Sequence, residues 1–352
     1  MSKKRATITP ELDASFASDN VAGVSPEVME ALAGANQGAA LPYGGDQVSA
    51  ELTDWAKTEF GDQAEILPVF NGTGANVVAL QGLLPRWGAA ICSAQAHVNN
   101  DEGAAPERLG AMKLLPRPTA DGKLTPADIQ AESAAIGFVH AAQPAAVTLT
   151  QSTELGTLYT PAEIAEVSEA AHALGMGVHI DGSRLSNAAA ALGMGLGEIT
   201  SEVGADIISL GGTKNGALAA EAVVVVNPER CHGIDYIRKF SMQLASKQRF
   251  VAAQLLALFG TELWRQNASH ANAQAAALGR AIAELPGAAL PTEPVVNAVF
   301  PEVTQEIADR IQQRYLAHIW DTSPAGKPVL RLMCSWQTTE EDISALVACA
   351  AG

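Results

Sequence analysis

Positive charge is scarce in this sequence. Its 352 residues include 22 Lys and Arg against 38 Asp and Glu, so the formal net charge is −16. A surface that binds nucleic acid needs a basic stripe to neutralise phosphates. The short basic run Lys3-Lys4-Arg5 is more typical of a solvated terminus. We therefore expect no nucleic-acid partner.

Long apolar runs and cysteines are also few. No apolar run approaches the roughly 20 residues of a membrane-spanning helix, and the N-terminus lacks the apolar stretch of a signal peptide. The sequence therefore predicts a cytoplasmic protein without a membrane partner. The cysteines are scattered without a CxxC spacing, which predicts reduced thiols and no metal site; they are Cys92, Cys231, Cys334 and Cys349.

Aliphatic side chains are abundant instead. Hydrophobic residues make up 48% of the chain and aromatic residues only 5%, which predicts a large aliphatic core. Short apolar runs without polar alternation are typical of strands buried on both faces of a parallel sheet, and helical patterns separate them. One helix is expected from Thr160-Pro161 to Ala173. The fold class is therefore α/β, with strands expected at 64–70, 89–94, 175–180, 205–210 and 221–226.

The last part of the chain has a different pattern. A long helical stretch is expected from Tyr236 to Leu285, with a break near Gly260, and is followed by strand, helix, strand, strand and helix. This order predicts a small α+β lobe. The predicted division is an N-terminal segment 1–20, a large domain 21–250 and a small C-terminal domain 251–352.

A glycine-rich turn, Asn71-Gly-Thr-Gly-Ala-Asn76, follows the first predicted strand and opens a helix. Gly72 and Gly74 let backbone N–H groups approach an anion, the Thr73 hydroxyl adds a donor, and the helix N-terminus adds partial positive charge. The turn is either a phosphate site or a plain turn capped by threonine. It has neither a GxGxxG nor a Walker pattern, so it does not indicate a nucleotide.

Two charged residues follow two later strands. Asp181, in the run His179-Ile-Asp-Gly-Ser-Arg184, ends a buried strand and needs a partner there. That partner is either a protonated ring nitrogen or a helix N-terminus. Lys214, in Gly211-Gly-Thr-Lys-Asn-Gly216, either reaches inward to an aldehyde cofactor or is solvated, and the apolar strands beside it favour burial.

His97 follows another predicted strand, with Glu102 close behind. An imidazole at a strand end can stack on a planar cofactor or transfer a proton. A structural, hydrogen-bonded histidine is the alternative.

These features, in this order, resemble the fold-type I pyridoxal-phosphate enzymes, and more specifically the low-specificity L-threonine aldolase family. The resemblance extends over nearly the whole chain. It implies an aspartate-aminotransferase-like fold, with a mainly parallel seven-stranded sheet in the large domain and a small C-terminal α+β domain. The matching segments are Ser18–Val21 (family SDTVT), Tyr43–Asp46 (YGDD), Asn71–Asn76 ((S/T)GTxAN), His97 with Glu102 (HxxxxE) and His179–Arg184 (HxDGAR).

The sequence departs from the family in two places. Where many members have a histidine in a segment similar to LENTHNG, this chain has Leu149-Thr-Gln-Ser-Thr-Glu-Leu-Gly156, which places Glu154 at that position. The run around Lys214 also differs from the commoner SKGLG pattern, although Lys214 is the only lysine at a suitable strand exit after Asp181.

The resemblance implies a set of roles around pyridoxal 5'-phosphate. Lys214 binds the cofactor covalently, Asp181 keeps the ring nitrogen protonated, and His97 stacks on the ring. Gly72 and Thr73 are assigned to the phosphate, together with Lys247 or Arg249; a solvated helix face is the alternative for the run that contains Lys247. Arg184 is assigned to both the cofactor and the substrate carboxylate. The substrate carboxylate is also assigned to Ser18 and Arg331.

The implied reaction is retro-aldol cleavage of L-threonine, L-allo-threonine or related β-hydroxy-α-amino acids, including phenylserine, to glycine and an aldehyde. The base that takes the β-hydroxyl proton is His97, with Glu102 or Glu154 assisting. The alternatives are another β-eliminating lyase or aminotransferase on this fold, and a cofactor-free binding scaffold. The family also implies a homodimer or homotetramer, in which residues near Tyr43 and Lys247 complete a neighbour's site.

Overall fold

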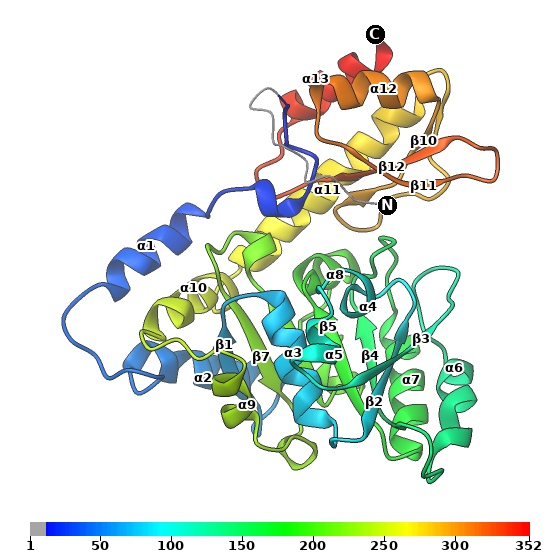
Figure 1. Cartoon of the computed structure of the whole chain (residues 1–352). Helices are drawn as coiled ribbons and strands as arrows, with labels where there is room; N and C mark the ends of the chain where they lie inside the picture. The colour runs from blue at the N-terminus through cyan, green and yellow to red at the C-terminus, as the bar shows by residue number, and fades with distance from the viewer. Residues whose placement is uncertain (1–11) are drawn as a thin grey trace. The chain divides into compact units, whose positions relative to one another are not determined.

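A seven-stranded sheet forms the centre of residues 24–267 in the computed structural model, which describes residues 12–352 (Figure 1). The basic run at residues 3–5 lies outside the described residues. The strand order is β1-β7-β6-β5-β4-β2-β3, and β7 is antiparallel to both of its neighbours while the other pairs are parallel. The predicted mainly parallel sheet is confirmed. Its strands are β1 (Glu65–Val69), β2 (Gly88–Ser93), β3 (Lys113–Arg117), β4 (Gln143–Thr150), β5 (Gly177–Gly182), β6 (Ile207–Gly211) and β7 (Glu221–Val225).

Five of these strands coincide with the predicted apolar runs, and β3 and β4 are the two that the pattern misses. β3 pairs only with β2, so it is an edge strand and tolerates its Lys, Pro and Arg. β4 carries Thr148 and Thr150, whose hydroxyls contact His179 and Glu154. Polar groups that belong to the site therefore interrupt the apolar pattern of β4.

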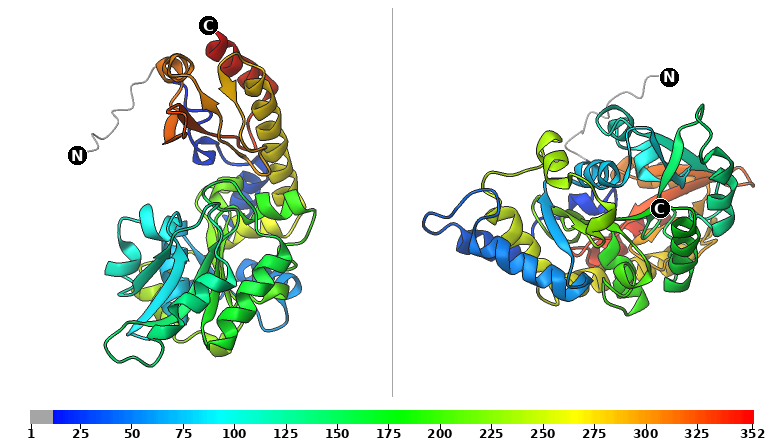
Figure 2. Two further views of the ribbon diagram at one scale, coloured as in Figure 1. Left: turned by 90° about the vertical axis from the view of Figure 1, so that its right-hand side faces the viewer. Right: turned by 90° about the horizontal axis from the view of Figure 1, so that it is seen from below.

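Helices cover both faces of the sheet, which is why its strands are apolar without alternation (Figure 1, Figure 2). Alternate residues of β7 show the two faces: Val224 packs in one core cluster, and Val223 and Val225 pack in the other. The first cluster includes residues of α2 (Gln47–Phe60), α7 (Pro161–Ala173), α8 (Leu185–Leu192) and α10 (Arg249–Phe259). The second includes residues of α3 (Gly72–Leu83) and α9 (Ile234–Phe240).

Local sequence explains where α7 begins and ends. Thr160 caps the helix in a capping box with Glu163, and Pro161 occupies the first turn. Gly175, with a φ of 76°, follows the C-terminus. The predicted helix from Thr160 to Ala173 is confirmed. The remaining helices of residues 24–267 are α1 (Pro26–Ala35), α4 (His97–Asn100), α5 (Ala105–Arg108) and α6 (Pro126–Glu132).

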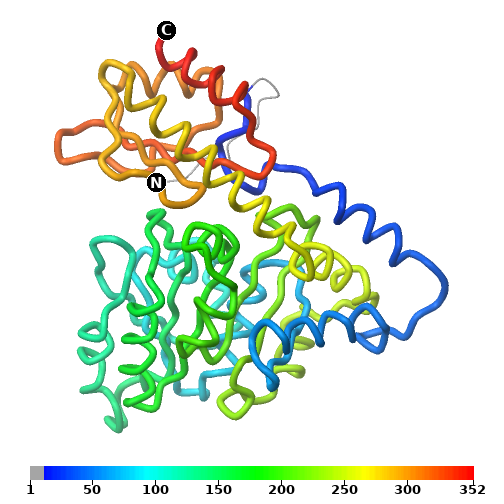
Figure 3. Tube along the Cα trace, turned by 180° about the vertical axis from the view of Figure 1, so that it is seen from behind, coloured from blue at the N-terminus to red at the C-terminus, as the bar shows by residue number. Residues whose placement is uncertain are grey.

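The predicted long helix from 236 to 285 is three helices in the structure: α9, α10 and α11 (Leu263–Ala283). The break at Gly260 is as expected, and α11 then continues as one helix (Figure 3). A further break, at residues 241–248, is a correction. There Met242 adopts a left-handed φ of 62°, and the Gln243 N–H bonds back to the Arg238 carbonyl at 2.9 Å, which ends α9.

A second compact unit joins the start of the described chain to its end, residues 12–23 and 268–352. The units divide the chain at 23/24 and 267/268, where the sequence analysis places boundaries at 20/21 and 250/251. α10 falls in the larger unit because it packs against α1 and α2. The N-terminal segment packs with the C-terminal residues: Phe16 is buried in the same core cluster as Tyr315.

This second unit also contains most of α11, a small antiparallel sheet and two further helices. The first strand expected in this lobe, in the apolar run Val295–Phe300, is paired only at Ala298–Val299. No helix of the described residues is long and apolar enough to cross a membrane. The elements are β8 (Ala288–Ala289), β9 (Ala298–Val299), β10 (Glu302–Val303), β11 (His318–Thr322), β12 (Pro328–Met333), α12 (Gln305–Arg314) and α13 (Glu340–Ala351).

Candidate active site

The polar side chains singled out in the sequence gather at the carboxyl ends of parallel strands. Asp181 is the last residue but one of β5, Lys214 lies just after β6, and Glu154 lies just after β4. Because β4, β5 and β6 are neighbours and run parallel, these three ends meet at one edge of the sheet. This is the edge at which open α/β sheets bind ligands.

Asp181 is a buried carboxylate with donors on both oxygens. Its Oδ1 accepts from the Ser183 backbone N–H at 3.1 Å and the Ser183 hydroxyl at 2.8 Å, and its Oδ2 accepts from Asn76 Nδ2 at 2.9 Å. Burial alone would raise the pKa of Asp181. The neighbouring His179 and Lys214 and the Ser183 and Asn76 hydrogen bonds outweigh burial and lower this pKa.

His179 supports this carboxylate from the sheet. Its Nδ1 lies 2.8 Å from the Thr148 hydroxyl and its Nε2 lies 2.9 Å from the Ser209 hydroxyl, so the ring is held across β4, β5 and β6. Complete burial lowers the pKa of His179 to about 4, against the opposing effect of Asp181. The imidazole is therefore neutral at pH 7. The positive charge of Lys214 and the donors from Asn76 and Ser183 then keep Asp181 ionised.

A hydrogen-bond network connects His97 to Asp181 through Glu102 and Asn76. Asn76 Nδ2 also donates to Glu102 Oε1 at 2.8 Å, and the same oxygen lies 2.9 Å from His97 Nδ1. Glu102 is 6% exposed, whereas 41% of the His97 side chain is exposed. The hydrogen bond to Glu102 raises the pKa of His97, although burial works against it. Since Glu102 occupies Nδ1, Nε2 is the ring atom left for a ligand.

Glu154 joins the same hydrogen-bond network through the backbone N–H of His97. Its Oε1 accepts from the His97 N–H at 2.7 Å and from the Thr150 hydroxyl at 3.1 Å. Its Oε2 is buried and has no hydrogen-bond partner among residues 12–352. Burial, and secondarily the charge of Asp181, raises the pKa of Glu154. Glu154 therefore presents a buried oxygen that is ready to take a ligand or a proton.

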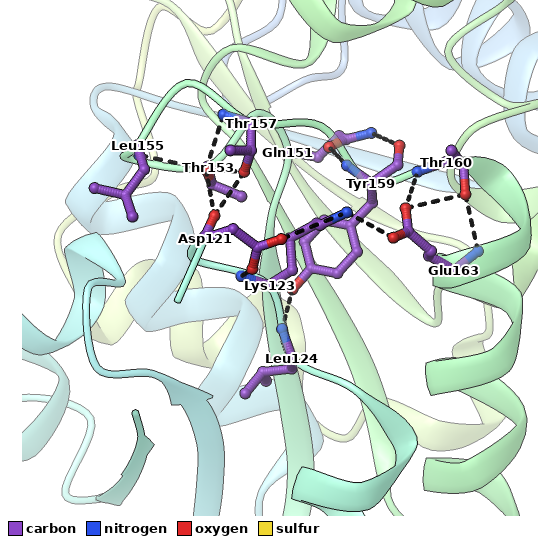
Figure 4. A network of polar contacts seen from close by, with 10 residues as sticks. All are labelled: Asp121, Lys123, Leu124, Gln151, Thr153, Leu155, Thr157, Tyr159, Thr160 and Glu163. Atoms are coloured by element: carbon purple, nitrogen blue, oxygen red, sulfur yellow. Dashed lines mark hydrogen bonds and ion pairs between the residues drawn. The ribbon is translucent and has the colours of Figure 1, made fainter. Parts of the chain in front are cut away.

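A polar network fixes the loop that carries Glu154 (Figure 4). Gln151 donates to the Tyr159 carbonyl at 2.9 Å and accepts from the Tyr159 N–H at 3.1 Å, which closes the loop at its base. The Thr153 and Thr157 hydroxyls lie 2.7 Å apart, and Thr157 donates to the Asp121 carbonyl at 2.7 Å. These bonds connect the two ends of the loop at residues 151–159 and join its middle to Asp121.

The glycine-rich turn forms the N-terminus of α3. The Asn71 side chain caps the helix by accepting from the Gly74 N–H at 2.7 Å. The first-turn N–H groups of Gly72 and Thr73 have no acceptor within the helix. Gly72 and Thr73 are both half-buried, and a Cβ built on Gly72 would lie 3.5 Å from the Ser183 hydroxyl. The predicted anion loop therefore adjoins the Asp181 turn.

The loop that carries Lys214 is held from three sides. Glu221 at the start of β7 accepts the N–H groups of Gly212 at 3.0 Å and Thr213 at 3.3 Å. Gln254 of α10 accepts from the N–H groups of residues 218 and 219. Asn215, next to Lys214, donates to the Trp264 carbonyl at 2.9 Å. Lys214 itself is half-buried.

The structure places the remaining predicted residues in different settings. Arg184 is half-buried at the residue before α8. Lys247 is exposed, and Arg249 donates to the Gly38 carbonyl at 3.3 Å. Ser18 and Arg331 belong to the other unit. There the Ser18 hydroxyl accepts from Asn20 N–H at 3.2 Å, and the Arg331 guanidinium lies 4.9 Å from the centre of the Trp320 ring.

Three residues at the site are given no role on the basis of the sequence. Asn76 lies inside a quoted motif, but only the fold reveals that it bridges Asp181 and Glu102. Glu221 sits in an apolar run, where an isolated carboxylate is the signal for a buried partner. Gln243 gives no signal, because its partner Phe70 is 173 residues away. Among the described residues, no group of His, Cys, Asp and Glu side chains is placed to hold a metal ion.

This sheet, with strand-end Asp181 and Lys214, places the chain in the aspartate-aminotransferase-like fold type I, as the sequence predicts. The family model described as beta-eliminating lyase matches residues 15–306. A low specificity L-threonine aldolase of Pseudomonas aeruginosa is 38% identical over 94% of this chain and 95% of its own length. Another, from Pseudomonas sp. (strain NCIMB 10558), is 37% identical over 95% of this chain and 96% of its own.

A solved structure agrees with these relatives. The threonine aldolase of Leishmania major superposes with a TM-score of 0.88 at 25% identity, over 95% of this chain and 97% of that one. The chain belongs to the low-specificity L-threonine aldolase family of the beta-eliminating lyases. The resemblance that the sequence motifs indicate is thereby confirmed, together with the lyase class.

Proposed function

We propose that this protein is a pyridoxal-phosphate-dependent aldolase that cleaves L-threonine, L-allo-threonine and related β-hydroxy-α-amino acids to glycine and an aldehyde. One observation carries the proposal. Asp181 is a buried carboxylate kept ionised by Asn76 and Ser183, and it lies at the strand end beside that of the Lys214 loop. A buried ionised carboxylate calls for a cationic partner, and a protonated pyridine nitrogen is such a partner.

The residues present fit pyridoxal phosphate. Gly72 and Thr73 offer free N–H groups to its phosphate, Asp181 offers a carboxylate to its ring nitrogen, and Lys214 offers an amine to its aldehyde. Buried oxygens without partners among residues 12–352, on Glu154 and Glu102, leave polar capacity for a ligand. When bound, the cofactor withdraws electrons from the α-carbon of an amino acid attached to it.

His97 is the group we assign to the β-hydroxyl proton. With Nδ1 against Glu102, its Nε2 can accept that proton, and Glu102 stabilises the imidazolium that results. Glu154 bonds to the His97 backbone and fixes the position of this residue. The partly exposed ring is also free to stack on a planar cofactor.

Three residues are candidates for the substrate carboxylate. A guanidinium offers paired donors that match a carboxylate, which favours Arg184 and Arg331, and the Ser18 hydroxyl can add a donor. These assignments rest on the family resemblance. The small-molecule partners in the proposed reaction are an amino acid and an aldehyde.

The specific alternative is β-elimination, which the name of the matching family model favours. Incubation of the holoenzyme with L-threonine, L-allo-threonine and phenylserine separates the two reactions. The aldolase gives equal amounts of glycine and aldehyde without ammonia. Ammonia and a keto acid without glycine would instead establish elimination and overturn the proposal.

We also propose a homodimer or homotetramer in the cytoplasm. Large apolar side chains are exposed on the larger unit near the loop between α9 and α10: Tyr236 is 83%, Phe240 74% and Met242 72% exposed. Burial of such side chains against a second copy would be favourable. A monomer in light scattering of the holoenzyme would contradict this assembly.

A further inference from the structure

Gln243 contacts the glycine-rich turn from a distant part of the chain. It lies in the loop between α9 and α10, and its Oε1 accepts the Phe70 N–H at 3.0 Å. Phe70 is the residue that joins β1 to the turn at the start of α3. Because an N–H group can meet only the amide oxygen, this bond fixes which way the amide of Gln243 points. Nε2 is therefore on the other side of the amide.

The Gln243 amide packs directly on Gly74. A Cβ built on Gly74 would lie 2.3 Å from both Cδ and Nε2 of Gln243, so a side chain at residue 74 would displace this amide. The second glycine of the turn is thus needed for this close approach. Gln243 and the first turn of α3 form a single surface, although nothing in the local sequence of either segment indicates it.

Several donors on this surface have no acceptor among residues 12–352. Gly74 N–H is taken by Asn71, but the N–H groups of Gly72 and Thr73 have no acceptor within the helix. The structure records no acceptor for Gln243 Nε2 among residues 12–352. An amide nitrogen carries two N–H groups, so this small area offers several donors to one anion.

We infer that Gln243 Nε2 donates to the phosphate of the cofactor, beside the N–H groups of Gly72 and Thr73. This inference rests on the proposed function. It adds a neutral amide of the same chain to the phosphate donors Gly72 and Thr73. Lys247, in the segment predicted to complete a neighbour's site, is exposed in this chain, and Arg249 bonds to the Gly38 carbonyl. Within one chain, the phosphate is thus held by neutral donors at the positive end of α3.

The substitution Gln243→Glu tests the donor specifically. The glutamate retains an oxygen for the Phe70 N–H, so the structural bond survives, while a carboxylate replaces the donor. Pyridoxal 5'-phosphate and pyridoxal, which lacks the phosphate, are titrated separately into the full-length protein freed of cofactor, and binding is followed by absorbance. We expect at least a tenfold loss of affinity for pyridoxal phosphate and less than a twofold change for pyridoxal.

The loss of affinity of Gln243→Glu for pyridoxal phosphate should become larger as the pH rises. The second ionisation of a phosphate ester has a pKa near 6, so repulsion by the new carboxylate increases between pH 5.5 and 7.5. Gln130→Glu is the matched control, because Gln130 also donates from its side-chain amide but bonds to the Ser133 hydroxyl and is exposed on α6. This control should bind both ligands as the wild type does.

Two results with Gln243→Glu would overturn the inference. Wild-type affinity for pyridoxal phosphate in Gln243→Glu, or an equal loss for both ligands, would show that Gln243 is only structural. If Gln243→Glu does not fold, Gln243→Met and Gly74→Ala replace it, with the same selective loss expected. Failure of the wild-type protein to bind either ligand would overturn the proposed function itself.

Discussion

Asn76 on α3 donates from Nδ2 to Oδ2 of Asp181 at 2.9 Å, and this bond connects the helix of the anion loop to the end of β5. The same nitrogen also bonds to Glu102 at 2.8 Å. Asn76 is 1% exposed, so its two contacts are shielded from water. One side chain thus contributes to the ionisation of Asp181 and also holds Glu102, the acid that bonds to His97.

Replacement of Asn76 by aspartate should weaken the ring-nitrogen end of the site. A third carboxylate would face Asp181 and Glu102, which raises the pKa of Asp181 and favours its neutral form. We expect the affinities for pyridoxal phosphate and pyridoxal to fall together, by at least tenfold, unlike the selective loss at Gln243. Titration by absorbance measures both, with Asn36→Asp on the surface as the control. Unchanged affinities would exclude this role.

Glu154→Gln tests the residue that departs from the family pattern. Glutamine can still accept from the His97 N–H and the Thr150 hydroxyl, but it cannot take a proton at Oε2. We expect kcat/KM to fall by about 10²-fold, unequally for threonine and phenylserine. Because the pKa of Glu154 is raised, its carboxylate forms only as pH rises, so the acid limb of the wild-type profile should also change. Unchanged kinetics with both substrates, as in the exposed control Glu166→Gln, would refute the role.

Glu221→Gln should change how stability depends on pH. Burial raises the pKa of Glu221 to about 7, against opposing bonds and charge from Thr213, Lys214 and Gly212. The native state therefore binds this proton more tightly than the unfolded state, and the carboxyl destabilises the fold as pH rises from about 4.5 to about 7. At about 1.4 kcal/mol per pKa unit, the variant should gain about 3 kcal/mol relative to the wild type between pH 5 and pH 8.

Urea unfolding at the two pH values measures this gain. Glu65→Gln is the control, because Glu65 is exposed at the start of the neighbouring β1. Equal pH dependence in the wild type and Glu221→Gln would show that Glu221 does not titrate in the native state.

Tyr159→Phe should destabilise the loop that carries Glu154. The Tyr159 hydroxyl is buried and accepts the Leu124 N–H at 2.6 Å, and its loss leaves that N–H without a partner (Figure 4). We expect the free energy of unfolding to fall by about 1–3 kcal/mol, with faster hydrogen exchange at residues 151–159. Tyr236→Phe, at an 83% exposed tyrosine, should be neutral. Equal hydrogen-exchange rates at residues 151–159 in Tyr159→Phe and Tyr236→Phe would show that the Tyr159 hydroxyl does not stabilise this loop.

The sequence predicts the parts of the site that depend on local pattern. Asp181 and Lys214 follow apolar strands, and Gly72 and Thr73 open a helix, so their positions at one sheet edge follow from the α/β pattern. Contacts between distant segments leave no such pattern. Gln243 reaches Phe70 only because a left-handed Met242 breaks the expected long helix. Glu221 is hidden in an apolar strand, and its partners are N–H groups that every sequence has.

Borohydride reduction tests whether the cofactor is attached to Lys214. The holoenzyme is reduced, digested, and mapped by mass spectrometry for the pyridoxyl-phosphate adduct. We expect the adduct on the peptide that contains Lys214, and its loss in Lys214→Ala. An adduct on another lysine, such as Lys247, or no adduct in a protein that binds the cofactor, would show that Lys214 does not hold it.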